Sequence, residues 1–309
     1  MPAQGEAVDH PVHERRLISV ALPVRNAERT LPVALASILL QSYRHWELLV
    51  LDDYSSDSSR VIARKIAEAD ARLRVIDARG PAGLVPRLNQ AVGVARGEFF
   101  ARMDADDVAY PTRFQRQIEF LCRHPDIDVV GTWMLVFRGD GIVRGVRAAP
   151  TEHEMIIRRP SSGFRLFHPT WMGKIEWFRT HRYRGYARRC EDQELLLRSF
   201  TRSRFANIPD PLLGYREDRV ELVPMLCGRA KFAKLVTARL AERSRYGRAT
   251  AVLLEQAAKA GAEMAAASLR LECLLRNRAR SASPDFIAGW EEVWSNTLRR
   301  ARQLDGERS

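Results

Sequence analysis

Cysteine is scarce in this sequence. The 309-residue chain has four, Cys122, Cys190, Cys227 and Cys273, each isolated from the others. No CxxC pair and no spacing typical of zinc ligands occurs, so a zinc site built on paired cysteines is excluded. Scattered cysteines suit a reducing compartment better than a disulfide framework. We therefore expect a protein of the cytoplasm.

Long apolar runs are also missing. The longest apolar stretches, such as residues 48–51 and 129–137, are strand-length or interrupted. A membrane-spanning helix needs about 20 apolar residues. The first residues show no basic start followed by an apolar core, so we expect no signal peptide.

Basic residues, nearly all of them arginine, are what the sequence has in excess. The chain has 50 basic and 38 acidic residues, a formal net charge of +12, and is 46% hydrophobic. From Val223 onward, 16 basic and 9 acidic residues give a net charge of +7. Such a balance fits nucleic acid, an anionic membrane surface or an acidic substrate as a partner, or a solvated helical surface without one.

Strand and helix patterns alternate through the first third of the chain. The expected strands are residues 17–22, 46–51, 73–76 and 98–103, and the expected helices are 30–39, 58–69 and 84–95. This alternation with short connections predicts an α/β fold, a mostly parallel sheet flanked by helices. In such sheets, ligands bind beyond the carboxyl ends of the strands.

An acidic cluster follows the fourth expected strand. Asp104, Asp106 and Asp107 lie within four positions, directly after the apolar run Phe99-Phe100-Ala101. Crowded carboxylates repel one another unless a cation or donor groups compensate, and Mg²⁺ or Mn²⁺ prefers such oxygen ligands. The alternative is a solvated turn that caps the next helix, since Pro111 and an apolar helical period follow. Polar turns after two other strands, at residues 23–26 and 52–53, favour a shared binding crevice.

Three regions are expected along the chain. Residues 1–16 read as a flexible arm, residues 17–222 as the α/β domain, and residues 223–309 as a basic helical C-terminal region. Within the domain we expect helices at 111–123 and 191–200. We also expect a hairpin of strands 127–137 and 142–146 around Gly139-Asp140-Gly141. The C-terminal region should be helical from about residue 224, including 250–275 and 290–302.

A longer set of motifs occurs in order between about Ile18 and Arg216. They are residues 23–26 (PVRN), 37–43 (SILLQSY), 46–57 (WELLVLDDYSSD), 83–84 (GL), 88–89 (LN), 95–98 (ARGE), 101–107 (ARMDADD), Pro111, Arg113, Gln117, 168–170 (HPT) and 191–192 (ED). With these residues the chain resembles family 2 of the glycosyltransferases, the inverting, nucleotide-sugar-dependent enzymes with the GT-A fold.

The resemblance assigns the sugar donor to the strand ends. It implies that Asp52 or Asp53 accepts a hydrogen bond from the N–H of a uracil or thymine base, and that Pro23, Val24 and Asn26 line the same pocket. The alternative for the acidic pair is helix capping.

The resemblance also assigns a divalent cation, Mn²⁺ or Mg²⁺. Asp104 and Asp106 match the family's DxD positions, with Asp106 as the direct ligand and Asp104 touching the ribose, or the metal through water. Asp107 is expected to cap or support the loop.

The family's general base matches Asp192, with Glu191 orienting it or contacting the acceptor. An acidic pair at a helix N-terminus is also favoured by the helix dipole alone. His168 is a candidate contact to the acceptor or to a phosphate, or a structural histidine.

The expected function is therefore inverting transfer of a sugar from a UDP- or dTDP-sugar to a glycan or lipid-linked acceptor. Cell-surface polysaccharide, lipopolysaccharide or another glycoconjugate would be the product. The basic C-terminal region suggests peripheral contact with the inner face of a membrane. Two alternatives are a nucleotidyltransferase of similar fold and a basic nucleic-acid-binding protein. The turn after the first strand has no glycine, which counts against a nucleotidyltransferase. No zinc or RNA-binding motif occurs, so no nucleic acid is expected as a partner. The sequence does not indicate an oligomeric state.

Overall fold

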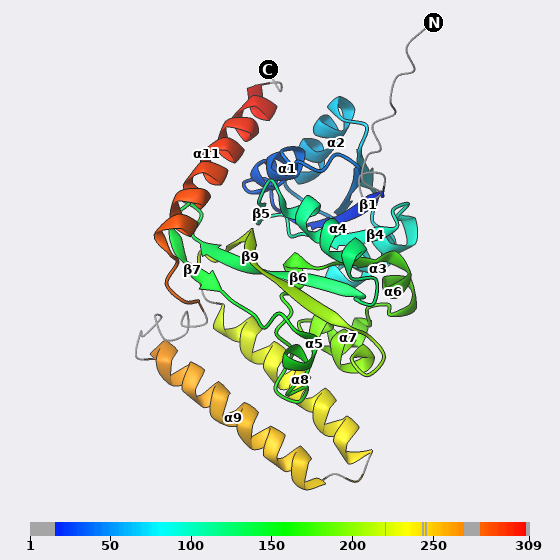
Figure 1. Ribbon diagram of the computed structural model, residues 1–309, viewed down its shortest axis with the longest axis vertical. Helices are drawn as coiled ribbons and strands as arrows, with labels where there is room; N and C mark the ends of the chain where they lie inside the picture. The colour runs from blue at the N-terminus through cyan, green and yellow to red at the C-terminus, as the bar shows by residue number, and fades with distance from the viewer. Residues whose placement is uncertain (1–15, 220, 243, 245, 269–278, 307–309) are drawn as a thin grey trace, which may run out of the picture.

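The computed structural model describes residues 16–219, 221–242, 244, 246–268 and 279–306 (Figure 1). The predicted arm at residues 1–16, except for Arg16, lies outside this range. So does the end of the predicted helix at 250–275, from residue 269 onward.

Four parallel strands form the first half of the sheet, as predicted. They are β1 (Ile18–Val24), β2 (Trp46–Asp52), β3 (Leu73–Ile76) and β4 (Phe99–Arg102), in the order β3-β2-β1-β4. Helices α1 (Leu31–Leu39), α2 (Ser59–Ala69) and α3 (Leu84–Val94) connect them. All residues of β2 are buried, since apolar side chains from both faces pack into the core.

The second half of the sheet is mixed. Beyond β4 follow β8 (Met172–Lys174), β6 (Val129–Phe137), β9 (Phe205–Arg216) and the short β5 (Val108–Ala109). Strand β7 (Val143–Arg147) pairs with β6 antiparallel, which confirms the predicted hairpin.

Strands β5, β8 and β9 were not predicted from the sequence. Pro209 and Pro211 interrupt the strand pattern of β9, because proline lacks the main-chain N–H that pairs with a neighbouring strand. In the structure, the register between β6 and β9 shifts between Thr132 and Trp133, opposite these prolines. The irregularity lets a proline-containing strand stay in the interior of the sheet.

Further helices lie around the sheet. They are α4 (Arg113–Arg123), α5 (His153–Ile156), α6 (Ile175–Thr180), α7 (Glu191–Ser199), α8 (Leu222–Ala241), α9 (Tyr246–Ser268) and α11 (Pro284–Gly306), with short 3₁₀ turns at His168–Thr170 and Gly185–Ala187. Helices α8 and α9 run antiparallel, with α9 on the outer side of α8 (Figure 1). Among the described residues, no helix has the length and apolar character needed to cross a membrane.

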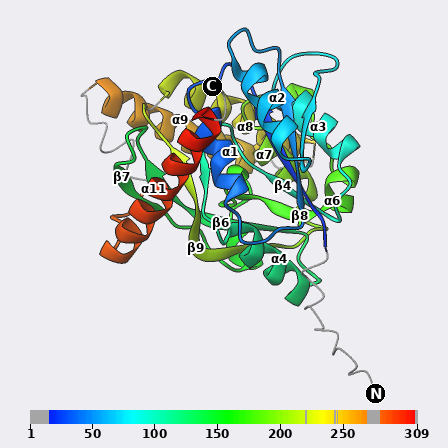
Figure 2. The ribbon, with the colours of Figure 1, turned by 90° about the horizontal axis from the view of Figure 1, so that it is seen from above.

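Helix α11 packs apart from α8 and α9. It lies beside α1, as Figure 2 shows, and its Trp290 is fully buried. The ring of Trp290 contacts Phe137 of β6 at 4.6 Å between ring centroids, and its Nε1 donates to the carbonyl of Gly141 over 2.7 Å. The C-terminal helices therefore pack in two separate places. Helices α8 and α9 pack against each other, and α11 packs against α1 and the sheet.

Candidate active site

The acidic cluster lies in the turn between β4 and β5. One carboxylate oxygen each from Asp104, Asp106 and Asp107 come within 4.8 Å of one another. Asp106 is exposed, Asp104 is partly buried, and Asp107 is 1% exposed. Three convergent oxygens on one turn are the donor set that a hard divalent cation prefers, so these residues fit Mg²⁺ or Mn²⁺.

Crowding changes the acidity of this cluster. Although Asp106 reaches the surface, surrounding protein atoms and the neighbouring Asp104 raise its pKa to about 6. Burial, together with Asp106 and Asp104, raises the pKa of Asp107 well above its usual range. The protein alone therefore does not compensate all three charges, which is consistent with a place for a cation.

Asp107 also has a structural partner. Its Oδ1 accepts a hydrogen bond from the main-chain N of Arg216 over 3.0 Å, and the Arg216 Nε donates to the carbonyl of Asp106 over 3.0 Å. The turn is thereby tied to β9, which holds the other two carboxylates in place.

Arg102 is a residue to which the sequence analysis gave no role. Its Nη2 lies 2.5 Å from Oδ1 of Asp104, and the residue is 4% exposed. Burial lowers the pKa of Arg102, but the nearby Asp104, Tyr183, Asp107 and Glu191 raise it overall. A charged side chain in a fully buried strand needs a partner. The position of an arginine directly after an apolar strand pattern could therefore have indicated a role for Arg102.

The two aspartates after β2 differ in their partners. The main-chain N of Gly83 donates to the carboxylate of Asp53, at 2.8 Å from Oδ2 and 3.0 Å from Oδ1. Oδ1 of Asp53 also lies 3.4 Å from Nε of the buried Arg87. Asp52 accepts from the N of Ser55 through Oδ2 over 3.3 Å, while its buried Oδ1 has no partner among the described residues. Asp52 thus keeps an acceptor free for a ligand.

The turn after β1 is joined to the turn after β2. Asn26, at φ +49°, accepts from the N of Ser56 through Oδ1 over 2.8 Å. The Val24 carbonyl accepts from the N of Asp53 over 2.7 Å, and the Val24 side chain is buried in the core beyond Pro23.

The acidic pair Glu191-Asp192 begins helix α7, as predicted. Arg189, two residues before it, has φ +76°, a left-handed conformation uncommon for arginine. Oε2 of Glu191 is buried without a partner among the described residues. Burial, and then the neighbouring Asp192, raise the pKa of Glu191.

His168 is 8% exposed, and its Nε2 lies 2.8 Å from the hydroxyl of Tyr183. Burial, and then the nearby Arg102, hold the pKa of His168 well below its usual range. The ring is therefore neutral near pH 7, so a contact to phosphate would be that of a neutral imidazole.

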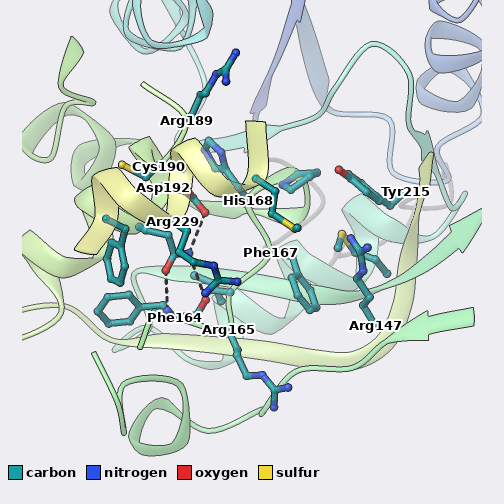
Figure 3. A pocket seen from close by; sticks show the side chains of 18 of the residues that line it. Arg147, Phe164, Arg165, Phe167, His168, Arg189, Cys190, Asp192, Tyr215 and Arg229 are labelled. Carbon is teal, nitrogen blue, oxygen red and sulfur yellow. Dashed lines mark hydrogen bonds between the residues drawn. The ribbon is translucent and has the colours of Figure 1, made fainter. Parts of the chain in front are cut away.

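A cavity of about 740 Å³ brings part of these residues together. Asp104, Asp192 and His168 all line it, and side chains from the sheet, from the loop before His168 and from α7 surround it (Figure 3). The residues assigned to the nucleotide at the ends of β1 and β2 do not line this cavity. Asp104 is the member of the acidic cluster that lines this cavity.

Comparisons with known proteins identify relatives of the chain. Residues 19–191 match the family described as glycosyl transferase family 2. EpsE of Bacillus subtilis (strain 168), which carries a provisional glycosyltransferase name, is 38% identical over 208 residues, 65% of this chain and 73% of EpsE. WfgD of Escherichia coli, named UDP-Glc:alpha-D-GlcNAc-diphosphoundecaprenol beta-1,3-glucosyltransferase, is 32% identical over 121 residues, 39% of this chain and 47% of WfgD.

A solved structure shares the fold. The mannosyltransferase PcManGT of Pyrobaculum calidifontis, in complex with GDP-Man and Mn²⁺, aligns with a TM-score of 0.54 and 18% identity. The alignment covers 94% of this chain and 90% of that one. Nothing in these comparisons favours a nucleotidyltransferase or a nucleic-acid-binding protein. The chain is a glycosyltransferase that belongs to family 2 and has the GT-A fold.

Proposed function

We propose that the enzyme is an inverting glycosyltransferase that uses a UDP- or dTDP-sugar and a glycan or lipid-linked acceptor. Its product would be a cell-surface polysaccharide, lipopolysaccharide or related glycoconjugate. The observation that carries the proposal is the shared cavity, because Asp104 of the acidic cluster and Asp192 of α7 face one space. WfgD, whose name gives a diphosphoundecaprenol-linked acceptor, supports the acceptor class.

The donor is assigned to the strand ends. Asp52 accepts the N–H of the base through its free oxygen, and Pro23, Asn26 and Asp53 shape the pocket. Asp104 and Asp106 are the residues that would hold Mn²⁺ or Mg²⁺. When bound, such a cation stabilises the charge that develops on the departing nucleoside diphosphate.

The acceptor hydroxyl is assigned to Asp192. As the acceptor oxygen forms its bond to the anomeric carbon, the bond from that carbon to the diphosphate breaks, and the diphosphate leaves with the electron pair. The Asp192 carboxylate takes the proton of the hydroxyl. Attack from the side opposite the leaving group inverts the anomeric configuration. Glu191, beside it, orients the base or contacts the acceptor.

A donor panel followed by product analysis tests this mechanism. Thermal shift with UDP-, dTDP- and GDP-sugars and Mn²⁺ identifies the donor, because a bound ligand raises the apparent stability. NMR of the product should then show the anomeric configuration opposite to that of the donor. Retention of configuration would contradict the proposal.

The variant Asp192→Asn tests the base. Transfer should fall about 10²–10⁴-fold, since the variant cannot take the proton, while donor binding stays unchanged. Asp285→Asn, on the exposed start of α11, is the matched control and should transfer normally. Full activity of Asp192→Asn would show that another group is the base.

We also propose peripheral contact with an anionic membrane through α9. Three large apolar side chains of α9, Leu253, Leu254 and Met264, are exposed. An outward apolar face on a helix of a basic region fits a helix lying in the membrane interface. The double variant Leu253→Ser and Leu254→Ser should float less with anionic vesicles than the original protein. Equal flotation would contradict this contact.

A further inference from the structure

The cavity extends from the proposed reaction centre to a wall made by α8 and α9. Helix α8 contributes Met225, Arg229 and Phe232 to the lining, and α9 contributes Gln256 and Lys259. The family match ends at residue 191, so this wall lies outside the matched residues. A volume of about 740 Å³ falls within the usual range of small-molecule sites, about 300–1,000 Å³.

The wall is held in place beside Asp192. A Cβ on Gly228 of α8 would lie 2.6 Å from the carbonyl oxygen of Arg189, so the helix packs directly on the segment before the acidic pair. On α9, Glu255 accepts from Oγ of Ser162 over 2.8 Å, which ties the helix to the loop at the cavity. The wall therefore has a defined position relative to the acceptor side of the reaction centre.

Gln256 presents an unused hydrogen-bond donor to the cavity. The residue is 5% exposed, and its Oε1 accepts from Nη1 of Arg229 over 2.9 Å. Arg229 is itself held by Glu263, with Nε to Oε2 at 3.1 Å. These bonds orient the amide of Gln256, and its buried Nε2 has no partner among the described residues. Buried amide nitrogens usually have an acceptor, so this Nε2 is available to an oxygen atom of a ligand.

Cations outnumber carboxylates among the residues that line the cavity, although Arg147, Arg229 and Lys259 are paired with Glu217, Glu263 and Glu255. Its lining carboxylates are Asp104 and Asp192, whereas the lining cations away from Asp104 are Arg147, Arg165, Arg189, Arg229 and Lys259. Arg165 and Arg189 have no carboxylate partner among the described residues, and they extend in opposite directions in Figure 3. The pair of Lys259 with Glu255 is about two-fifths exposed, and such pairs hold weakly, so Lys259 can exchange its partner for a ligand.

We propose that the α8–α9 wall binds a phosphate or diphosphate group of the acceptor. Gln256 Nε2 donates to a phosphate oxygen and Lys259 supplies charge. Placing the acceptor's hydroxyl at Asp192 rests on the proposed function, but the phosphate subsite itself does not. Two sources share this chemistry, a water-soluble sugar phosphate and the head of a lipid-linked sugar.

Direct titration of the full-length chain tests the subsite. Glucose 1-phosphate and methyl glucoside are titrated by calorimetry with EDTA present, so that no divalent cation at the acidic cluster can bind the phosphate. The phosphate should bind at least about tenfold more tightly, the usual effect of a hydrogen bond to a charged group. Equal affinity for the two probes would overturn the proposal and would indicate a subsite for neutral sugar hydroxyls.

Variants locate the binding. Gln256→Leu and Lys259→Met should each weaken binding of glucose 1-phosphate about tenfold. Gln256→Glu keeps the acceptor for Arg229 but adds a negative charge, so it should weaken binding further. Lys234→Met removes an exposed lysine of α8 that does not line the cavity, and it should bind like the original protein. Unchanged affinity of Gln256→Glu and Lys259→Met would overturn the proposal.

A third probe distinguishes the sources. A sugar diphosphate on a short isoprenoid chain should bind more tightly than glucose 1-phosphate if the natural group is lipid-linked, and equally if it is water-soluble. Donor hydrolysis with Mn²⁺ is measured separately and should be unchanged in the control Lys234→Met. Absence of donor turnover in every variant would count against the proposed function, while the titrations in EDTA still decide the phosphate subsite.

Discussion

The side-chain amide of Gln193 donates a hydrogen bond to Oδ2 of Asp192 over 3.0 Å. Its carbonyl accepts from the main-chain N of Phe164 over 2.8 Å. Gln193 therefore joins the start of α7 to the loop that lines the cavity. At Gly163, with φ +103°, a Cβ would lie 3.1 Å from the same carbonyl, so the loop passes closely over Gln193. We infer that Gln193 is a positioning residue for Asp192.

Replacement of Gln193 should slow transfer without affecting the donor. Gln193→Leu should lower kcat about tenfold, since one hydrogen bond to a charged group is lost, and leave the KM for the donor unchanged. Gln193→Glu keeps the acceptor for Phe164 but loses the donor to Asp192, so it should not restore kcat. Gln303→Leu on the exposed face of α11 is the control. An unchanged kcat in both Gln193 variants would refute the positioning role.

Removal of the proposed metal ligand should abolish donor binding that depends on a cation. Asp106→Asn should lose the thermal shift that Mn²⁺ and the donor give together, and transfer should fall about 10²–10³-fold, as when one group stabilising a leaving charge is lost. EDTA should do the same to the original protein. Activity that survives EDTA would contradict the cation.

Asp107 provides the contrast within the cluster. Because its Oδ1 accepts from the main-chain N of Arg216, Asp107→Ala, which removes this acceptor, should lower the free energy of unfolding by about 1–3 kcal/mol. Its response to Mn²⁺ should remain. Loss of the Mn²⁺ response with normal stability would instead make Asp107 a ligand. Chemical denaturation and thermal shift measure the two effects.

Arg102 should contribute most to the stability of the protein when no cation is bound at the acidic cluster. Arg102→Met leaves Asp104 without its buried partner, and breaking such a pair costs about 3–5 kcal/mol of unfolding free energy. Since the uncompensated carboxylates then attract a cation more strongly, Mn²⁺ should raise the melting temperature more than in the original protein. Arg102→Lys, which keeps the charge, is the matched control. A smaller Mn²⁺ response in Arg102→Met would contradict this account.

Stability should depend on pH through Glu47. Burial alone would raise its pKa, but hydrogen bonds from Ser19, Arg96 and Arg74 lower it overall. A lowered folded pKa means that the unfolded chain binds more protons. The contribution is therefore complete above the unfolded pKa of about 4.3 and is lost as the pH falls through the folded value.

Urea denaturation between about pH 3 and pH 6 measures this effect of Glu47. Glu47→Gln should be less stable near neutral pH and should lose less stability on acidification. Glu68→Gln on the exposed face of α2 should follow the original curve. Parallel curves for Glu47→Gln and the original protein would show that Glu47 contributes no pH dependence.

Helix α11 should be required for the stability of the sheet. Trp290 is fully buried against Phe137 and faces Gly214 of β9, where a Cβ would collide with its ring. Trp290→Ala should lower the free energy of unfolding by about 3–5 kcal/mol through the cavity it leaves. The half-buried Trp294, replaced by alanine, should cost less. If both tryptophan variants lose equally little unfolding free energy, α11 does not unfold together with the sheet.

Much of the fold could be predicted from local patterns. The strands β1 to β4 and the helices between them follow from apolar periodicity and short connections, and the structure confirms them. The short strand β8 and the proline-containing β9 were missed, because their strand conformation depends on partners far along the chain. The separate packing of α11 likewise depends on Trp290 meeting β6 and β9, which periodicity within α11 does not reveal.

The sequence by itself determined the family, the first four strands along the chain and the position of the acidic cluster at a strand end. These depend on residues close together in the chain, where spacing and polarity carry the information. Only the tertiary structure decided that Asp52 keeps a free oxygen while Asp53 is bound by Gly83, thirty residues away. It also placed Arg102 on Asp104 and brought Gln256 to the cavity of Asp192. Each of these contacts joins groups that are far apart in the chain or depends on which distant group occupies a hydrogen-bonding atom. Only folding brings such groups together.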